Sequence, residues 1–181
     1  MDKDEIINWI VTLCFFSCLL PFISCQEKHT EGIPSKIVEM LDREYPKWKI
    51  AEVSEDVREY FKTKGITRHP NVVSGDFNDD GLLDYALLIK PDPLKDRRMV
   101  IAFLNRDGSF DSYVLQSKLR PDFSAPEVYL WLFRKGERDY DYDADRYFHY
   151  PRDSIGVIYF EVAGASYIFT DGKFHEVVTS D

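Results

Sequence analysis

The stretch SGDFNDDGLLDYALLI, residues 74–89, predicts both the local fold and a candidate site. Counted from Asp76, side chains that carry oxygen atoms stand at positions 1, 3, 5 and 9: Asp76, Asn78, Asp80 and Asp84. Alternate residues of a tight loop point inward, and Gly81 at position 6 permits the sharp reversal that a side chain would obstruct. The spacing therefore predicts that several oxygen atoms converge on one point.

A point surrounded by oxygen atoms suits a hard cation such as calcium, which takes about 6–8 oxygen ligands. We expect the carbonyl oxygen of Leu82 to add a ligand and Asp84 to close the site, either directly or through a water molecule. The alternative is a turn that holds no metal, because Asp, Asn and Gly favour turns by themselves.

The residues on both sides of this loop predict strands. Residues 71–75 and 85–89 are short runs rich in β-branched and aliphatic side chains. An EF-hand would need helices there and a bidentate Glu at position 12, but position 12 is Leu87. We therefore expect a calcium loop between strands, with weak affinity and a Kd on the order of 10⁻⁴–10⁻³ M.

Residues 75–86, GDFNDDGLLDYA, resemble the core of an FG-GAP or VCBS repeat, the calcium-loop unit of integrin-type propellers. In that family a further strand follows, and then a turn with Asp-Gly and an aromatic residue, which residues 99–104 and 105–110 match. The resemblance covers about residues 71–117 and implies the following calcium ligands: Asp76, Asn78, Asp80, the carbonyl of Leu82, and Asp84. A propeller needs about 4–8 blades, whereas this sequence holds one complete unit, so we do not expect a closed ring.

Composition restricts the class of protein. A chain of 181 residues has room for one domain of ordinary size, and its 13 Phe, 11 Tyr and 3 Trp favour a β-rich fold. The net charge of −9, with no basic patch, argues against a nucleic-acid partner. All three cysteines lie in the first 25 residues, so neither a disulfide framework nor a thiol nucleophile is expected beyond them.

Those first 25 residues predict an export signal. Residues 6–24 are almost wholly apolar, and the sequence FISC at residues 22–25 resembles a bacterial lipobox, in which Cys25 would carry the lipid. A cleaved secretory signal and a retained anchor helix remain alternatives, because residues 2–5 are net negative where a signal is usually positive. Each alternative places the protein in the bacterial cell envelope, anchored in a membrane or in the periplasm, or secreted, with residues 26–33 as a linker.

Residues 34–181 are expected to form a single β-rich domain, with the calcium loop at residues 74–90. Pro34 begins one predicted helix that ends near Tyr45, and Ser54 begins a second that Gly65 ends. A strand is predicted over residues 48–53, and further strands over about 71–77, 84–90, 98–104, 110–116, 126–134, 154–162, 165–170 and 173–178. Asp107-Gly108 and Asp171-Gly172 indicate hairpins. The predicted class is α+β, with two N-terminal helices packed on a mainly antiparallel sheet or small sandwich.

A second acidic stretch occupies residues 137–150, ERDYDYDADRYFHY. Its acids and tyrosines suggest three alternatives: a loop that holds a second cation, a solvated loop whose acids pair with nearby arginines, or a contact surface built on tyrosine. The candidate surface residues are Asp139, Tyr140, Asp141, Tyr142, Asp143 and Asp145.

We find no Gly-x-Ser-x-Gly motif and no glycine-rich phosphate loop, so no catalytic residue is assigned. The sequence favours an exported lipoprotein that acts as a non-enzymatic binding module toward a protein or a glycan. The alternatives are an envelope hydrolase or enzyme inhibitor that uses residues 137–150, and a subunit of a larger propeller.

Overall fold

Two local sequence signals set the two helices of the described part of the chain. The computed structural model describes residues 30–95, 97–117 and 127–179. Helix α2 (Ser35–Glu44) follows Pro34 and ends before Tyr45, and it buries Ile37 and Leu41 on one face. Helix α3 (Glu55–Thr63) follows Ser54, whose side chain accepts a hydrogen bond from the Val57 amide at 3.3 Å. Both helices begin and end where proline, serine and glycine predict.

One antiparallel sheet holds the loop that follows residue 75. Its strands are β1 (Lys49–Ile50), β2 (Val72–Gly75), β3 (Asp84–Lys90), β4 (Met99–Arg106) and β5 (Ser109–Gln116). Their order is β1-β3-β4-β5, and β2 also pairs with β3. Asp107 and Gly108 both have positive φ, at 52° and 86°, so the β4–β5 connection is the tight hairpin turn that Asp-Gly favours.

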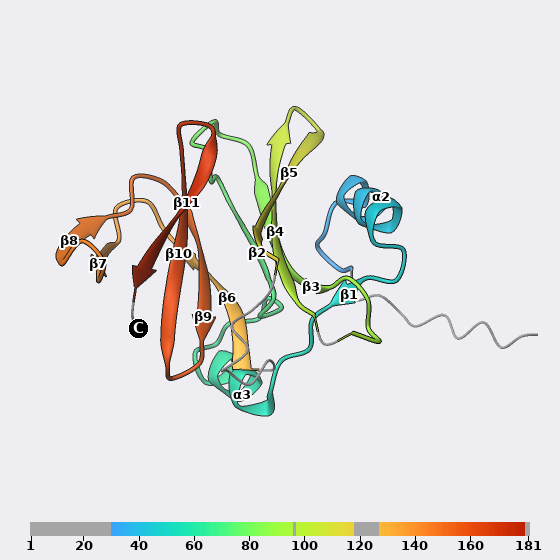
Figure 1. Cartoon of the computed structure of the whole chain (residues 1–181), viewed down its shortest axis with the longest axis horizontal. Coiled ribbons are helices and arrows are strands. Elements are labelled where there is room, and N and C mark those ends of the chain that lie inside the picture. Colours follow the sequence, from blue (N-terminus) through green and yellow to red (C-terminus); the bar gives the residue numbers. More distant parts are fainter. Residues whose placement is uncertain (1–29, 96, 118–126, 180–181) are drawn as a thin grey trace, which may run out of the picture.

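A second antiparallel sheet faces the first (Figure 1). It consists of β6 (Val128–Phe133), β9 (Ser154–Tyr159), β10 (Ala163–Thr170) and β11 (Lys173–Thr179), in the order β11-β10-β9-β6. Asp171 and Gly172 again both have positive φ, and they join β10 to β11.

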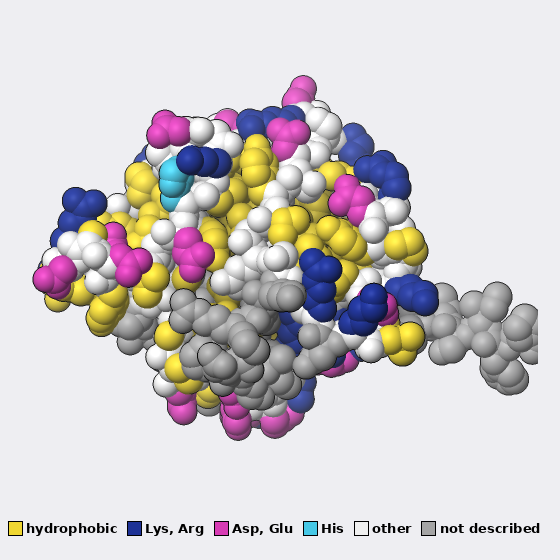
Figure 2. All heavy atoms as spheres, in the orientation of Figure 1, with side chains coloured by type: hydrophobic (Ala, Val, Ile, Leu, Met, Phe, Trp, Pro, Cys, Tyr) yellow, Lys and Arg dark blue, Asp and Glu magenta, His cyan; other side chains and the backbone are white. Residues whose placement is uncertain are grey.

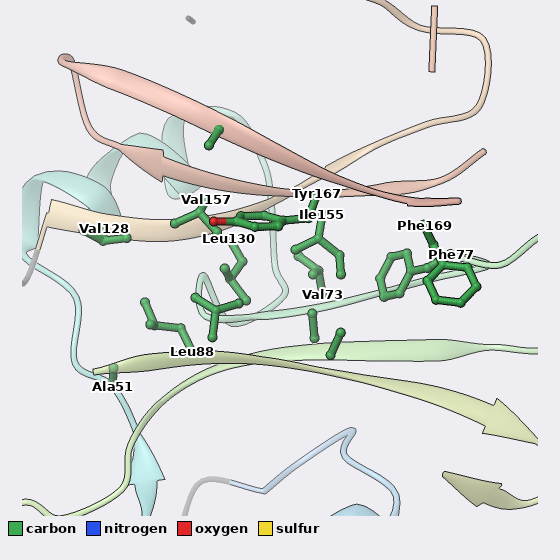
Figure 3. Packing of buried hydrophobic residues seen from close by; sticks show 14 of the residues in the cluster. Ala51, Val73, Phe77, Leu88, Val128, Leu130, Ile155, Val157, Tyr167 and Phe169 are labelled. Atoms are coloured by element: carbon green, nitrogen blue, oxygen red, sulfur yellow. The ribbon is translucent and has the colours of Figure 1, made fainter. Parts of the chain in front are cut away.

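The main core lies between the two sheets. Alternate residues of each strand point inward, so Val73 and Leu88 from one sheet face Leu130, Ile155 and Val157 from the other (Figure 3). These five side chains are almost completely buried. At about 25 cal/mol per Å² of apolar surface, such burial is the main force that holds the sheets together.

Each helix covers the outer face of one sheet. Ile37 and Leu41 of α2 pack with Leu87 and Ile101 on the first sheet, and Phe61 of α3 packs with aromatic and aliphatic residues of the second. Strand β3 is therefore covered on both faces, which explains why it is an unbroken apolar run rather than an alternating one.

The predicted class is confirmed: the chain is α+β and mainly β, with two helices near the N-terminal end followed by antiparallel sheets. The strand predicted over residues 48–53 is shorter and covers only β1. Residues 137–150 were expected to form a loop, but they contain a hairpin of β7 (Arg138–Asp141) and β8 (Arg146–His149). Because aspartate is uncommon in strands, the alternation of Asp with Tyr did not indicate this two-stranded ribbon.

The export prediction falls outside the described residues. Cys25 and the apolar run of residues 6–24 lie before residue 30, and so does half of the predicted linker, residues 26–29. Among the residues that the structure describes, no helix is long and apolar enough to cross a membrane.

Glu52 makes the stability of the fold depend on pH in the acidic range. Its carboxylate accepts hydrogen bonds from Lys49 and Lys90, and these bonds lower the pKa of Glu52 from 4.5 to about 2. Because the folded-state pKa is depressed, the stabilisation is present above pH 4.5 and is lost as the pH falls toward 2. The Glu52 side chain is 56% exposed, so we expect it to contribute less than about 1 kcal/mol.

We therefore predict that Glu52→Gln lowers the free energy of unfolding at pH 7 and has a much smaller effect at pH 2.5. Urea unfolding of both proteins at each pH measures this. An equal difference at the two pH values would show that the ion pairs contribute nothing.

Candidate functional site

The loop between β2 and β3 turns its polar side chains toward its own backbone. The Asp76 carboxylate accepts hydrogen bonds from the amides of Asp80 and Gly81, at 3.0 and 2.8 Å. Asn78 Oδ1 accepts from the Asp80 amide at 3.2 Å, and Asp80 Oδ1 accepts from the Leu82 amide at 2.9 Å. The three side chains therefore gather oxygen atoms on the inner side of the loop. Gly81 lies at φ +83°, the left-handed conformation that glycine adopts without strain.

Asp84 fixes the end of the loop to the neighbouring strand. Its side chain is fully buried, and its two carboxylate oxygens accept hydrogen bonds from the Phe77 amide at 2.8 Å and the Asn105 amide at 2.7 Å. One carboxylate thus joins the start of the loop, the start of β3 and the end of β4. Asp84 therefore supports the loop from its buried side.

Burial raises the pKa of Asp84 to about 6, because desolvation disfavours the charged form. The amides of Asn105 and Phe77 oppose this rise, and the negative charges of Asp80 and Asp76 add to it. A positive charge placed near these three carboxylates would favour the ionised form of Asp84.

Basic side chains surround the outside of the loop. Lys135 donates to both carboxylate oxygens of Asp79 at 2.8 and 2.9 Å, and this contact lowers the pKa of Asp79. Arg152 donates to the Asn78 carbonyl at 3.1 Å, and Arg106 lies 3.7 Å from Asp80 Oδ2. Asp79 stands at position 4 of the loop, which is not one of the predicted ligand positions. It faces Lys135, whereas the oxygens of Asp76 and Asn78 lie on the inner side of the loop.

Asp153, the residue before β9 of the second sheet, connects the loop to that sheet. Its carboxylate accepts hydrogen bonds from the Asp76 amide at 3.4 Å, from Arg134 at 2.9 Å and from the Lys135 amide at 3.1 Å. Gly75 makes this approach possible, because a Cβ atom there would lie 2.8 Å from Asp153 Oδ2. The loop is thereby tied to the segments that enter and leave the β7–β8 hairpin.

The loop offers part of the ligand set that the sequence predicts for calcium. Asp76, Asn78 and Asp80 turn toward one another, and an oxygen that accepts one hydrogen bond keeps a second lone pair for a cation. Asp84 is directed to amides, which fits a contact through water better than a direct one. Within the described ranges, no three His, Cys, Asp or Glu side chains are grouped so that they could hold a metal ion. Calcium binding by these residues and the Leu82 carbonyl stays a prediction.

In the β7–β8 hairpin, the acidic side chains of residues 137–150 have separate hydrogen-bond partners. Asp139 accepts a hydrogen bond from the Tyr150 hydroxyl at 2.6 Å, and Asp145 accepts one from the Tyr140 hydroxyl. Asp141 accepts from the amides of residues 143 and 144, which closes the turn between the strands. Each of these three carboxylates thus has its own local partner. Asp143 and Tyr142 are exposed at the tip of the hairpin.

Sequence reasoning missed the residues of the second sheet's segments that contact the loop: Lys135, Arg152 and Asp153. They lie more than 50 residues from the loop in sequence, and only the pairing of the sheets brings them to it. No spacing pattern predicts such a contact.

No protein-family model, no curated protein and no solved structure matches this chain. A functional assignment therefore depends on the chemistry of its own residues.

We predict that Asp84→Ala lowers the free energy of unfolding by about 2–5 kcal/mol, because it leaves two buried amides without an acceptor at about 1–3 kcal/mol each. The matched control is Asp111→Ala, which removes an exposed carboxylate of β5 that pairs with Arg106 at 3.0 Å. That change should cost less than about 1 kcal/mol. Denaturant unfolding of the two variants checks this, and equal losses would contradict the anchoring role of Asp84.

Proposed function

We propose that this chain is an exported lipoprotein of the bacterial cell envelope whose β domain is a calcium-stabilised, non-enzymatic interaction module. Lipidation of Cys25 would attach it to a membrane, and its partner would be a protein or a glycan outside the cytoplasm. The apolar run of residues 6–24 and the lipobox-like FISC sequence support export. The net charge of −9 makes a nucleic-acid partner unfavourable.

The observation that carries the calcium part of the proposal is the inward direction of both Asp76 oxygens, Asn78 Oδ1 and Asp80 Oδ1, whereas Asp80 Oδ2 accepts from the Asn78 side chain at 2.7 Å and faces Arg106. Each of these inward oxygens accepts an amide hydrogen on the inner side of the loop at 2.8–3.2 Å. A calcium ion there would be held by these side chains and the Leu82 carbonyl, with Asp84 behind them. Its charge would offset the mutual repulsion of the three carboxylates, so its role would be to stabilise the connection between β2 and β3.

We do not propose the hydrolase or inhibitor alternative. It depended on acids of residues 137–150 acting together, and Asp139, Asp141 and Asp145 each accept hydrogen bonds from a different local group. These bonds have a clear structural purpose, and no observation among the described residues favours catalysis there.

The test is a thermal melt of the full chain in detergent micelles, with EDTA, calcium or magnesium. At 10 mM calcium, a Kd on the order of 10⁻⁴–10⁻³ M gives roughly 1.4–2.7 kcal/mol of added stability. We expect Asp76→Asn and Asp80→Asn to lose this increment.

Asp79→Asn is the matched control, because Asp79 faces Lys135 outside the loop. It should keep the calcium increment even if its stability falls. The calcium proposal fails if calcium and magnesium give the same melting temperature as EDTA, or if all three variants keep the increment.

A further inference from the structure

The β7–β8 hairpin projects from the body of the protein beside the end of β11 (Figure 1). Its strands pair in register, with Asp139 opposite Phe148 and Tyr140 opposite Tyr147. Because alternate residues of a strand point to opposite faces, these two pairs lie on different faces of the ribbon.

The inner face is packed against the body. Phe148 contacts the ring of Tyr150 edge-on with the centroids 4.9 Å apart, and Tyr150 stacks on Phe133 at 4.7 Å. The Tyr150 side chain is 1% exposed, and its hydroxyl donates to Asp139. The hairpin is therefore anchored through one of its two faces.

Backbone hydrogen bonds fix the hairpin at both ends. At the base, the Gly136 amide donates to the Tyr150 carbonyl at 2.8 Å, and the Tyr150 amide donates to the Glu137 carbonyl at 2.9 Å. Near the tip, the Tyr142 amide donates to the Val178 carbonyl of β11 at 3.1 Å. A partner would meet a surface that is already ordered, which reduces the entropy cost of binding.

The outer face is a cluster of tyrosine rings. Tyr140 lies edge-on to both Tyr142 and Tyr147, with centroid separations of 5.0 and 4.9 Å. Tyr142 is 55% exposed and Tyr147 is 63% exposed, although large aromatic side chains are usually well buried. Tyrosine is enriched at the centres of protein interfaces because its ring buries much area at a low cost in side-chain entropy.

The charge of the hairpin indicates what kind of partner would bind it. Residues 137–150 contain five acids and two arginines, a net charge of −3 with His149 neutral, and Asp143 is exposed beside the tyrosines. At the left edge of Figure 2, where Figure 1 places β7 and β8, acidic, basic and yellow side chains lie close together. The chain itself shows that one of these rings accepts a cation, because its own Arg138 guanidinium lies 3.8 Å from the centroid of the Tyr147 ring.

We propose that the outer face of the β7–β8 hairpin binds a basic segment of a partner protein. Lysine or arginine side chains of that segment stack on the exposed rings of Tyr142 and Tyr147 and pair with Asp143. This inference rests on the proposed function, in that it names the partner chemistry of the interaction module.

The experiment uses the full chain in detergent micelles and an unstructured 15-residue peptide in which arginine alternates with glycine and serine. Binding is measured by fluorescence anisotropy of the labelled peptide at 50 and 300 mM salt, with a glutamate peptide of the same design and a neutral oligosaccharide as further probes. We expect the arginine peptide to bind and the other probes not to bind. High salt should weaken its affinity.

The double variant Tyr142→Ser/Tyr147→Ser should weaken arginine-peptide binding at least tenfold, and Asp143→Asn about threefold. Two matched controls should leave the affinity unchanged: Val114→Ser removes an exposed apolar side chain of β5, and Glu161→Gln removes one negative charge beyond β9. The proposal is overturned if the hairpin variants and the controls behave alike, if the arginine peptide does not bind, or if the oligosaccharide binds in its place.

The two proposals fail separately. A calcium-dependent melting temperature without arginine-peptide binding would overturn the hairpin surface and leave the calcium module intact. Peptide binding that depends on Tyr142 and Tyr147, together with a melting temperature that calcium leaves unchanged, would overturn the calcium module and leave the hairpin surface intact.

Discussion

The buried carboxylate of Asp84 is the constraint on which the candidate site depends. It accepts hydrogen bonds from the amides of Phe77 and Asn105 and so ties the loop to the adjacent strand at 2.7–2.8 Å. Phe77 is itself fully buried in the core between the sheets (Figure 3). The part of the loop between these anchors, residues 78–83, is therefore held at both ends by buried groups.

This loop also joins the two sheets. Asp153 reaches the Asp76 amide from the second sheet, and Lys135 and Arg152 contact Asp79 and the Asn78 carbonyl from the segments that flank the β7–β8 hairpin. A cation that stabilised the loop would for this reason also stabilise the base of the hairpin. The proposed calcium loop and the base of the proposed binding hairpin are in physical contact, although each proposal can be tested without the other.

Local signals in the sequence were enough to predict most of the fold. Ser54 and Pro34 mark the helix starts, and the Asp-Gly pairs at residues 107–108 and 171–172 mark two hairpins, because each acts on the few residues beside it. The β7–β8 hairpin was not predicted, since its strands alternate Asp with Tyr and depend on Tyr150 and Val178 for their position. For the same reason the loop's own residues were predicted as a site, but the side chains that hold it from the second sheet were not.

The central claim is that residues 76–84 form a cation site linked to the rest of the fold. Amide hydrogen exchange of the full chain, with EDTA and then with 10 mM calcium, tests it most directly. We expect calcium to slow exchange at the amides of Asp80, Gly81 and Leu82 and, more weakly, at the Lys135 amide that donates to Asp153. Unchanged exchange at all four amides would contradict the claim and leave the loop as a turn held only by its own hydrogen bonds.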